Sequence, residues 1–428
     1  TSSESSFEKM MFSGAPHSYF CVCIVLTSLM IGVFSESEKS VAECETHLKN
    51  MFKKVNFTNV VEQLFESQLN DTGFVYSDLT LVHHLITMFA LGSPPVRRSI
   101  RKYLGLDPEC DNVLLCAAMD KMIQQINDRQ SPEILYFFSQ LYHQNNTVVK
   151  GLDACARKKE IDFTRDSQTV LTDINKEYRE YCPTESGYLN KSLNPREVLY
   201  LLDAFRVTGD VYGKIKLVRS TLIPEFYDLH GSAKLVNWLQ ISGKWWRGCR
   251  SPQREKVPGT ECPVYIKIYA SERQDIHTLY FQPEFSMYEH EYEKRVACLR
   301  EILLNIREYI NWAITKKSVG NCVKNPNTMY ANIAVPVMDL STSYDLTTVL
   351  TKDLGPLFEE NEIAGIGERR HTLHSFIGWE HMTNKPANYT ELQLQTKTAF
   401  LHIYTPFVYA IVDKHSQIIL KAGAFLSG

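Results

Sequence analysis

Apolar residues recur at helical spacing in three parts of the chain and predict helices there. Residues 56–70 place apolar side chains at every third or fourth position, which is typical of a helix with one buried face. Residues 79–91 are largely apolar and are followed by Gly-Ser-Pro-Pro at 92–95, so we expect a buried helix that stops there. Residues 288–315 repeat the spacing and predict one long amphipathic helix.

The last thirty residues follow a different pattern. Residues 406–412 and 418–426 are rich in β-branched and aromatic residues, and the polar segment 413–416 separates them, so we expect a terminal β-hairpin. Helices come early, mixed elements lie in the middle, and strands come last. No repeat and no Pro/Gly/Ser-rich linker divides the chain, and we therefore predict an α+β fold in one large unit.

An uncharged apolar run at residues 19–34 indicates a secretory signal peptide. Its sixteen residues are short for a membrane-spanning helix, which needs about twenty. Val33 and Ser35 suit a cleavage site before Glu36, where a polar stretch begins. The predicted parts of the chain are upstream residues plus signal peptide at 1–35, an N-terminal tail at 36–54 and the main domain at 55–428.

Secretion changes the expected state of the cysteines. Of eleven cysteines, Cys21 and Cys23 lie in the predicted signal peptide, which leaves nine in the mature chain. In an oxidising compartment some of them form disulfides, and an odd number leaves at least one over. The spacing does not define the pairing, and no CxxC pair favours a zinc or redox site. The nine are Cys44, Cys110, Cys116, Cys155, Cys182, Cys249, Cys262, Cys298 and Cys322.

Glycosylation sequons agree with an extracellular protein. The Asn-x-Ser/Thr pattern occurs five times, and in combination with a signal peptide it predicts glycans on a solvent-exposed surface. The acceptor residues are Asn56, Asn70, Asn145, Asn190 and Asn388.

Composition and motifs exclude several functions. The net charge of −3 argues against a dedicated nucleic-acid-binding protein, and 44% hydrophobic residues are typical of a globular domain. No GxSxG, Walker A, HExxH or GxGxxG motif is present, so we predict no catalytic residues, no cofactor and no metal site. His371, His374 and His381 have a spacing that matches no common metal-ligand pattern.

A cluster of basic residues is a weak candidate for binding a sulfated glycosaminoglycan. The alternative is an ordinary solvated helix face, which such charge runs usually form. The cluster comprises Arg97, Arg98, Arg101 and Lys102.

Several separated segments resemble characteristic segments of the serpin superfamily, and they occur in the serpin order. Residues 74–106 are similar to the family's strand, Ser-Pro-x-Ser turn and buried helix, and residues 201–209 (LLDAFRVTG) are similar to LVNAIYFKG. Residues 331–366 resemble the serpin stretch that contains YDL, LG and GI in that order, which correspond here to residues 344–346, 354–355 and 365–366. Residues 405–423 resemble HPFLFFIRD followed by ILFMG. The resemblance covers about residues 55–428, and its order and spacing make it specific.

The resemblance implies one domain with three β-sheets, about nine helices and an exposed reactive loop near the C-terminus. In inhibitory serpins a protease cleaves this loop, which inserts as a new strand into the central sheet and carries the trapped protease along. The usual loop length places the scissile bond near Thr396, Lys397 or Thr398. Lys397 would suit a trypsin-like protease.

The chain departs from the family in the shutter, the set of residues that holds the central sheet closed. The family's Ser-Pro-x-Ser is Ser77-Asp-Leu-Thr80 here, and its asparagine is Asp203. An aspartate lacks the two amide donors of asparagine. It also places a charge in the interior, which is costly unless a partner compensates that charge. The family's sheet histidine corresponds to His374, two residues from the position that alignment on Glu380 gives.

The hinge, residues 380–386, departs further. Inhibitors follow the glutamate with small residues, whereas here Glu380 precedes Met382, Thr383, Lys385 and Pro386. Side chains alternate along a strand, so we expect Lys385 to face the core of an inserted strand in either alignment. Pro386 cannot donate a hydrogen bond within a central strand.

Two functions remain after these comparisons. The preferred one is a secreted serpin-fold protein without protease-inhibitory activity, which acts by binding as a carrier, a partner-binding protein or an extracellular structural component. A storage role is not separable from it by sequence. The alternative is a serine protease inhibitor cleaved near Lys397. The expected partner is an extracellular protein, a small ligand or a trypsin-like protease, and not a nucleic acid or, after signal removal, a membrane.

Overall fold

The computed structural model divides the chain into two units, Thr1–Ser40 and Val41–Gly428. Almost everything that the structure describes lies in the second unit. The described residues are 39–129, 135–144, 155–181, 199–208, 215–219, 225–250, 264–270, 275–283, 292–315, 329–345, 350, 354, 375–384, 391–393 and 401–427.

Eight helices lie within these described residues. In chain order they are α2 (Val41–Phe52), α3 (Thr58–Ser67), α4 (Asp78–Leu91), α5 (Pro94–Leu104), α6 (Asn112–Asp128), α7 (Ser167–Tyr181), α8 (Tyr292–Leu304) and α9 (Ile306–Thr315). None of them is long and apolar enough to cross a membrane.

The predicted helices are confirmed in position, with one exception in continuity. α3 and α4 occupy the two segments that the apolar spacing predicts, and α4 ends where Gly92 donates its N–H to the Met88 carbonyl at 2.7 Å. The single long helix expected over 288–315 is wrong, because the helix is interrupted at Asn305, between α8 and α9. There the Asn305 side chain donates to the Glu301 carbonyl at 3.0 Å, and its backbone N–H donates to the same carbonyl at 3.1 Å, so the interruption is confined to this residue.

Helix α2 corrects the expected N-terminal tail. Its residues fall inside the segment 36–54, yet Cys44, Leu48 and Phe52 are completely buried in the core. The disulfide Cys44–Cys110 ties α2 to the segment before α6. The amphipathic pattern of this helix buries one face against α6, so the folded unit includes residues 41–52.

A five-stranded sheet has the order β12-β13-β4-β2-β3. β4 and β13 are parallel neighbours, paired from Tyr200 and Ser375 to Val207 and Met382, and we call this pairing the β4–β13 seam. The other pairs are antiparallel except β2 with β3. The strands are β2 (Leu135–Gln144), β3 (Arg157–Ile161), β4 (Leu199–Val207), β12 (Asp339–Asp345) and β13 (Ser375–Thr383).

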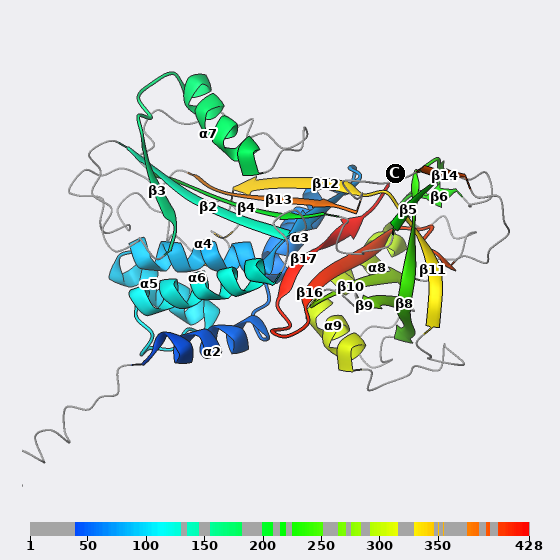
Figure 1. The fold of residues 1–428 in the computed structure, drawn as a ribbon, viewed down its shortest axis with the longest axis horizontal. Coiled ribbons are helices and arrows are strands. Elements are labelled where there is room, and N and C mark those ends of the chain that lie inside the picture. The colour runs from blue at the N-terminus through cyan, green and yellow to red at the C-terminus, as the bar shows by residue number, and fades with distance from the viewer. Residues whose placement is uncertain are drawn as a thin grey trace, which may run out of the picture. The chain divides into compact units, whose positions relative to one another are not determined.

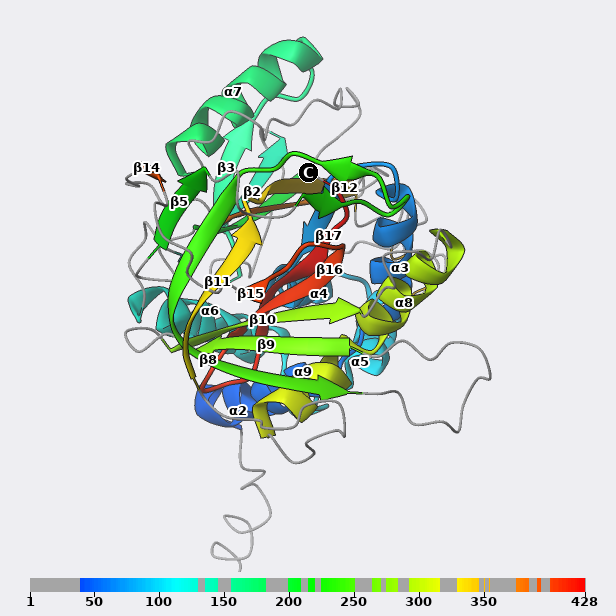
Figure 2. The same ribbon diagram turned by 90° about the vertical axis from the view of Figure 1, so that its right-hand side faces the viewer.

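A ten-stranded sheet and a two-stranded sheet complete the described β-structure. The larger sheet follows β1-β17-β16-β10-β9-β8-β11-β15, with β5 beside β8 and β14 beside β5 (Figure 2). Its strands are β1 (Gly73–Tyr76), β5 (Ile215–Arg219), β8 (Trp238–Arg250), β9 (Val264–Ala270), β10 (Ile276–Pro283), β11 (Met329–Pro336), β14 (Glu391–Gln393), β15 (Leu401–His402), β16 (Phe407–Asp413) and β17 (Ile419–Phe425). The small sheet pairs β6 (Phe226–Tyr227) with β7 (Ala233–Lys234). The antiparallel pair β16–β17 confirms the predicted hairpin.

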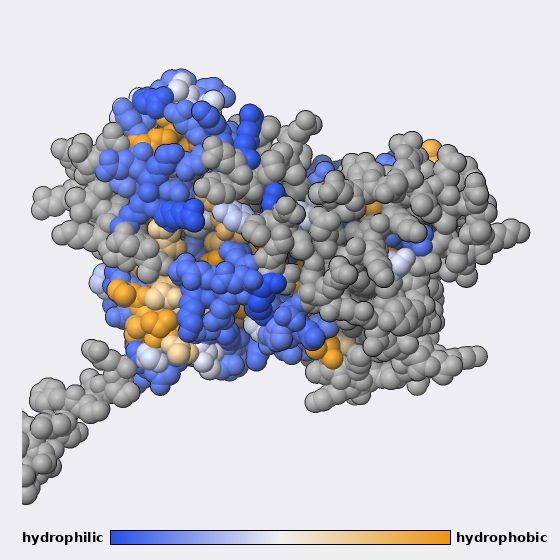
Figure 3. All heavy atoms as spheres, in the orientation of Figure 1, coloured by the Kyte–Doolittle hydropathy of each residue, from blue (hydrophilic) through white to orange (hydrophobic). Residues whose placement is uncertain are grey.

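Helices cover both faces of the five-stranded sheet. α7 lies on one face, and α4 and α6 lie on the other (Figure 1). A small apolar cluster fills the layer under α7, and the main core lies on the opposite side of the sheet. The outer side of α7 is hydrophilic (Figure 3). The buried strands β13 and β4 therefore lie between two layers, and any new strand at their seam would enter this interior.

Candidate functional site

The first part of the site is the N-terminus of α4, where the family's shutter turn lies. Ser77 caps the helix, since its hydroxyl accepts a hydrogen bond from the Thr80 backbone N–H at 3.2 Å. Both residues are completely buried. The Thr80 hydroxyl itself has no hydrogen-bond partner within the described part of the chain. Although the sequence is Ser77-Asp-Leu-Thr80 in place of the family's Ser-Pro-x-Ser, the helix is still capped, and the Ser77 hydroxyl is the side-chain group that caps it.

Asp203, which the resemblance assigns to the shutter, is paired. It lies in β4 opposite Gly378 of β13. The His83 Nδ1 atom lies 2.5 Å from Asp203 Oδ2, and the His84 Nδ1 atom lies 2.9 Å from the same oxygen. All three side chains are buried. The charge that the sequence places at this position is thus compensated by two imidazoles of α4.

The contacts of His83 define its protonation. Its Nε2 atom lies 2.8 Å from the Cys155 carbonyl oxygen, which only accepts, so Nε2 carries a hydrogen. Burial alone would raise the pKa of Asp203, but His83 and His84 hold it well below its usual range, so this carboxylate also accepts. Burial alone would lower the pKa of His83, yet Asp203 raises it overall. His83 is therefore an imidazolium that donates from both nitrogens.

These histidines are the residues that sequence reasoning missed. An adjacent His-His pair in an otherwise apolar helix predicts packing, and the structure adds a charge partner 120 positions away in the chain. His374, which the resemblance assigns to the shutter, lies outside the described residues, as does His371. Among the residues that the structure describes, no group of His, Cys, Asp or Glu is arranged to hold a metal ion.

A second buried pair occupies the turn itself. Asp78, which replaces the family's proline, forms an ion pair with Arg307 of α9. Burial raises the pKa of Asp78, and the Arg307 guanidinium opposes that shift. The pair connects the start of α4 to α9, so the turn before α4 is held from two sides.

The hinge end of β13 contains a third buried pair. Glu380 and Lys421 form an ion pair, and both side chains are completely buried. The Lys421 Nζ atom also lies 4.6 Å from the centre of the Phe205 ring. Phe205 of β4 is the register partner of Glu380 of β13. Lys421, on β17, therefore contacts both strands of the β4–β13 seam.

Asn384, directly after β13, is also buried and lies at the start of the segment that the resemblance assigns to the reactive loop. Its side chain donates to the Pro336 carbonyl at 2.7 Å and accepts from the Met338 N–H at 2.7 Å. Its backbone N–H donates to the Met338 carbonyl at 3.1 Å. Three hydrogen bonds thus hold this residue to the connection between β11 and β12.

The alternation along β13 changes one expectation for the hinge. Glu380, Met382 and Asn384 are buried, whereas Thr383 is only half-buried. Because side chains alternate, an unbroken continuation of β13 would turn Pro386 inward and Lys385 to the other face. The expected core-facing orientation of Lys385 in an inserted strand does not follow from this register.

Most of the segment that the resemblance assigns to the reactive loop lies outside the described residues. Lys385, Pro386 and the candidates for the scissile bond, Thr396, Lys397 and Thr398, all belong to that part. The described segment Glu391–Gln393 forms β14, which pairs in parallel with Leu217–Arg219 of β5. This short strand extends the edge of the ten-stranded sheet.

The basic cluster on α5 divides into two pairs. Arg97 donates to the carbonyls of Gly92 and Ala90, and Arg101 donates to the Cys110 carbonyl. The remaining two, Arg98 and Lys102, are exposed. Only half of the cluster therefore projects freely from the helix, which makes it a weaker glycosaminoglycan surface than the sequence indicates.

The disulfides and two exposed sequons are compatible with secretion. Cys116 is bonded to Cys155, and Cys298 also belongs to a disulfide. Asn56 and Asn70 are exposed; the Asn56 Nδ2 atom, which would carry the glycan, donates to the Leu304 carbonyl at 3.2 Å. The other three predicted glycosylation sites, Asn145, Asn190 and Asn388, lie outside the described residues.

Comparison with solved structures identifies the fold. The chain resembles protease nexin-1 solved with heparin, with a TM-score of 0.66, 14% identity, and coverage of 89% of this chain and 99% of that chain. Thyroxine-binding globulin in complex with thyroxine has a TM-score of 0.63 and 13% identity, with coverage of 88% of this chain and 99% of that chain. Uncleaved ovalbumin has a TM-score of 0.62 and 15% identity, with coverage of 88% of this chain and 99% of that chain. No protein-family model matches the chain, and no curated protein matches it in sequence.

These similarities define the class of protein. The chain has the serpin fold, an α+β single domain, and the predicted resemblance is confirmed at the level of the fold.

Proposed function

We propose that this chain is a secreted serpin-fold protein that acts by binding a partner and neither inhibits a protease nor catalyses a reaction. The observation that carries the proposal is Lys421, which contacts both strands of the β4–β13 seam from a completely buried position. An inhibitor must separate these strands to admit its cleaved loop. Separation here would remove the Lys421 ammonium from Glu380 or from the Phe205 ring.

The hinge supports the same proposal. Movement of the loop into the sheet would have to release the three hydrogen bonds of Asn384, and a buried polar group left without its partner costs about 1–3 kcal/mol. Pro386 follows two residues later and cannot donate a hydrogen bond to a neighbouring strand. Both features oppose the flexible hinge that insertion requires.

Secretion is part of the proposal. It is supported by the uncharged run at 19–34, by the two disulfides that join α2 and α6 to their neighbours, and by the exposed sequons at Asn56 and Asn70. Of the similar structures, one was solved with heparin and another with thyroxine, so similarity alone favours neither a polyanion nor a small ligand.

Incubation with trypsin, followed by denaturing gel electrophoresis, tests the proposal. We expect cleavage products and no covalent band of summed mass. The Lys397→Ala variant serves as the control, because an inhibitor cleaved at Lys397 would form the band in the unmodified protein and lose it in the variant. That pair of results would replace the proposal with the alternative, a serine protease inhibitor.

A further inference from the structure

A cavity of about 200 Å³ lies between α6, β2 and the segment Cys155–Arg157. α6 and β2 are in contact and form two of its walls. At one end of the cavity lie Asp120, Ser139 and Arg157, and at the other lies Asn127, two helical turns further along α6. Ile123 and Phe137 line the space between them.

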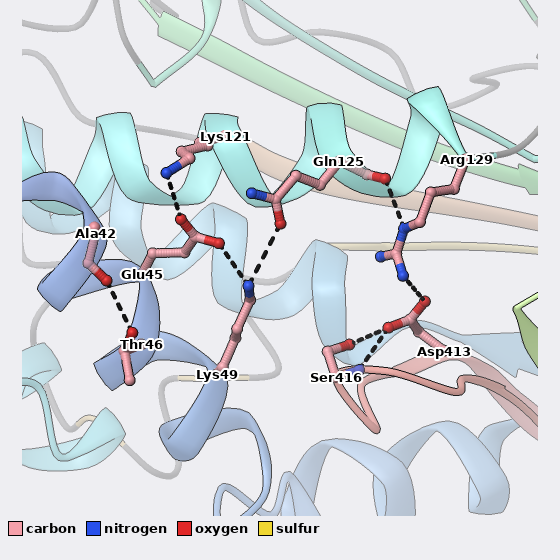
Figure 4. A network of polar contacts seen from close by, with 9 residues as sticks. All are labelled: Ala42, Glu45, Thr46, Lys49, Lys121, Gln125, Arg129, Asp413 and Ser416. Carbon is pink, nitrogen blue, oxygen red and sulfur yellow. Dashed lines mark hydrogen bonds and ion pairs between the residues drawn. The ribbon is translucent and has the colours of Figure 1, made fainter.

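The walls of this cavity are held in place independently of any ligand. The disulfide Cys116–Cys155 ties α6 to the third wall. On the other side of α6, Lys49 donates to Gln125, and Arg129 forms an ion pair with Asp413 at 3.0 Å (Figure 4). His83 closes the floor through its bond to the Cys155 carbonyl. The cavity is therefore preformed.

One end of the cavity carries opposite charges on Asp120 and Arg157, which form no ion pair with each other. Burial raises the pKa of Asp120, although the Arg157 charge acts to lower it. Asp120 accepts from Gln124 at 2.6 Å, and Arg157 forms no ion pair within the described part of the chain. Ser139 is the register partner of Asp203, and its buried hydroxyl has no hydrogen-bond partner among the described residues. An anionic and a cationic group side by side match a ligand with an ammonium and a carboxylate.

The far end offers an acceptor. The Asn127 Oδ1 atom is buried and has no hydrogen-bond partner in the described residues. Buried polar atoms are rarely left unpaired, so this oxygen indicates a donor that is supplied from the cavity. The apolar Ile123 and Phe137 between the two ends suit a flat, apolar body.

We propose that this cavity binds a free α-amino acid whose aromatic side chain ends in a hydrogen-bond donor. Its ammonium group faces Asp120, its carboxylate faces Arg157 and Ser139, its ring lies along Ile123 and Phe137, and its terminal hydroxyl donates to Asn127 Oδ1. This inference gives the proposed binding function a ligand class. It rests on that function only for its biological meaning, because the cavity would exist in an inhibitor as well.

Calorimetric titration of the full-length protein with L-tyrosine tests the proposal. We expect saturable binding that is at least about tenfold tighter than for L-phenylalanine, which lacks the hydroxyl, and for tyramine, which lacks the carboxylate. Absence of saturable binding at millimolar L-tyrosine would overturn the proposal, as would equal affinity for all three compounds. Neither result affects the trypsin experiment, so the two proposals fail separately.

Two variants locate the binding. Arg157→Gln should weaken L-tyrosine at least about tenfold and leave tyramine unchanged, and Asn127→Leu should remove the preference for L-tyrosine over L-phenylalanine. Lys159→Gln, an exposed position of β3 whose side chain pairs with Glu177 of α7, is the control and should change neither. If L-tyrosine binds and both variants leave its affinity unchanged, the site lies elsewhere and the assignment of this cavity is wrong. Folding of each variant is checked by its unfolding transition before titration.

Discussion

Lys421 lies in the apolar interior, where an ammonium group is costly unless a carboxylate compensates it. The resemblance has an aromatic residue at this position, and Glu380 occurs 41 positions earlier in a different sheet. Breaking such a pair by removing one partner costs about 3–5 kcal/mol, whereas replacing both partners with apolar residues is often neutral or stabilising. The two residues therefore act as one unit.

We predict that Lys421→Met lowers the free energy of unfolding by about 3–5 kcal/mol, because it leaves the Glu380 carboxylate buried and unpaired. The double variant Lys421→Met/Glu380→Met should recover most of this loss. Denaturant unfolding of both single variants and the double variant measures the coupling. As a control, Lys159→Met removes the exposed pair with Glu177 and should change the free energy by less than about 1 kcal/mol. A double variant that is no more stable than the singles would contradict the prediction.

The residues that compensate buried charge could not be found from local sequence. Asp203 is visible in the sequence as a departure from the family, and its cost is predictable, but its partners His83 and His84 lie on a helix that pattern analysis assigns to packing. Likewise, Asn384 is an ordinary polar residue in a loop sequence until the structure places it against Pro336 and Met338. Charge pairing depends on contacts between distant segments, which hydrophobic periodicity does not encode.

At the scale of elements, α2 shows how a helix is fixed to the domain by charge as well as by apolar contact. Glu45 is buried, with the Lys121 Nζ atom 2.8 Å away and Lys49 in contact at 2.5 Å (Figure 4). Burial alone would raise the pKa of Glu45, but bonds from Lys121, Lys49 and Gln125 lower it to about 2. The carboxylate thus joins α2 to α6.

We predict that Glu45→Gln lowers the free energy of unfolding by about 2–3 kcal/mol at neutral pH. The folded-state pKa of Glu45 lies below its unfolded value of 4.5, so this contribution is present above pH 4.5 and is lost as the pH falls toward about 2. The difference between the two proteins should therefore shrink over that range. Denaturant unfolding between pH 2 and 7 measures it. Asp173→Asn, at a half-exposed surface pair, should give a small difference throughout, and a Glu45→Gln difference independent of pH would refute the assignment.

Element prediction succeeded where the apolar pattern was strong and local. α3, α4 and the β16–β17 hairpin follow directly from spacing and from turn residues. The break between α8 and α9 does not follow from spacing, because the apolar positions continue past Asn305. α2 was missed because its amphipathic pattern is short and follows the polar stretch after the predicted signal peptide.

At the scale of the whole molecule, the sequence predicted the serpin fold because widely spaced segments occur in the family's order, and the similar solved structures confirm it. The function depends on a property that the fold alone does not define, which is whether the loop can enter the five-stranded sheet. That property is a balance of free energies between two states of one chain. The contacts of Lys421 at the β4–β13 seam and the hydrogen bonds of Asn384 stabilise the state in which the loop is outside the sheet. New strand hydrogen bonds would stabilise the state in which the loop is inserted.

The balance predicts that cleavage of the loop will not stabilise this protein. Each new strand hydrogen bond contributes about 1 kcal/mol net. Against this gain, Pro386 would turn inward in a continuation of β13 and leave a neighbouring carbonyl without its partner, and release of Asn384 would leave buried polar groups unpaired, each at about 1–3 kcal/mol. Opening the seam would also disturb the contacts of Lys421, whose ion pair is costly to break.

A thermal unfolding curve before and after a single protease nick between Ala387 and Ala399 measures the outcome. We expect the midpoint temperature to change by less than about 5 °C, since the costs offset most of the gain. The variant Asn384→Ser/Pro386→Ala relieves the hinge while keeping the same cleavage region, so its midpoint should rise more on nicking than that of the unmodified protein. A rise of tens of degrees in the unmodified protein would show that the loop inserts despite Pro386 and Asn384. The inhibitor cleaved near Lys397 would then become the better account of the molecule.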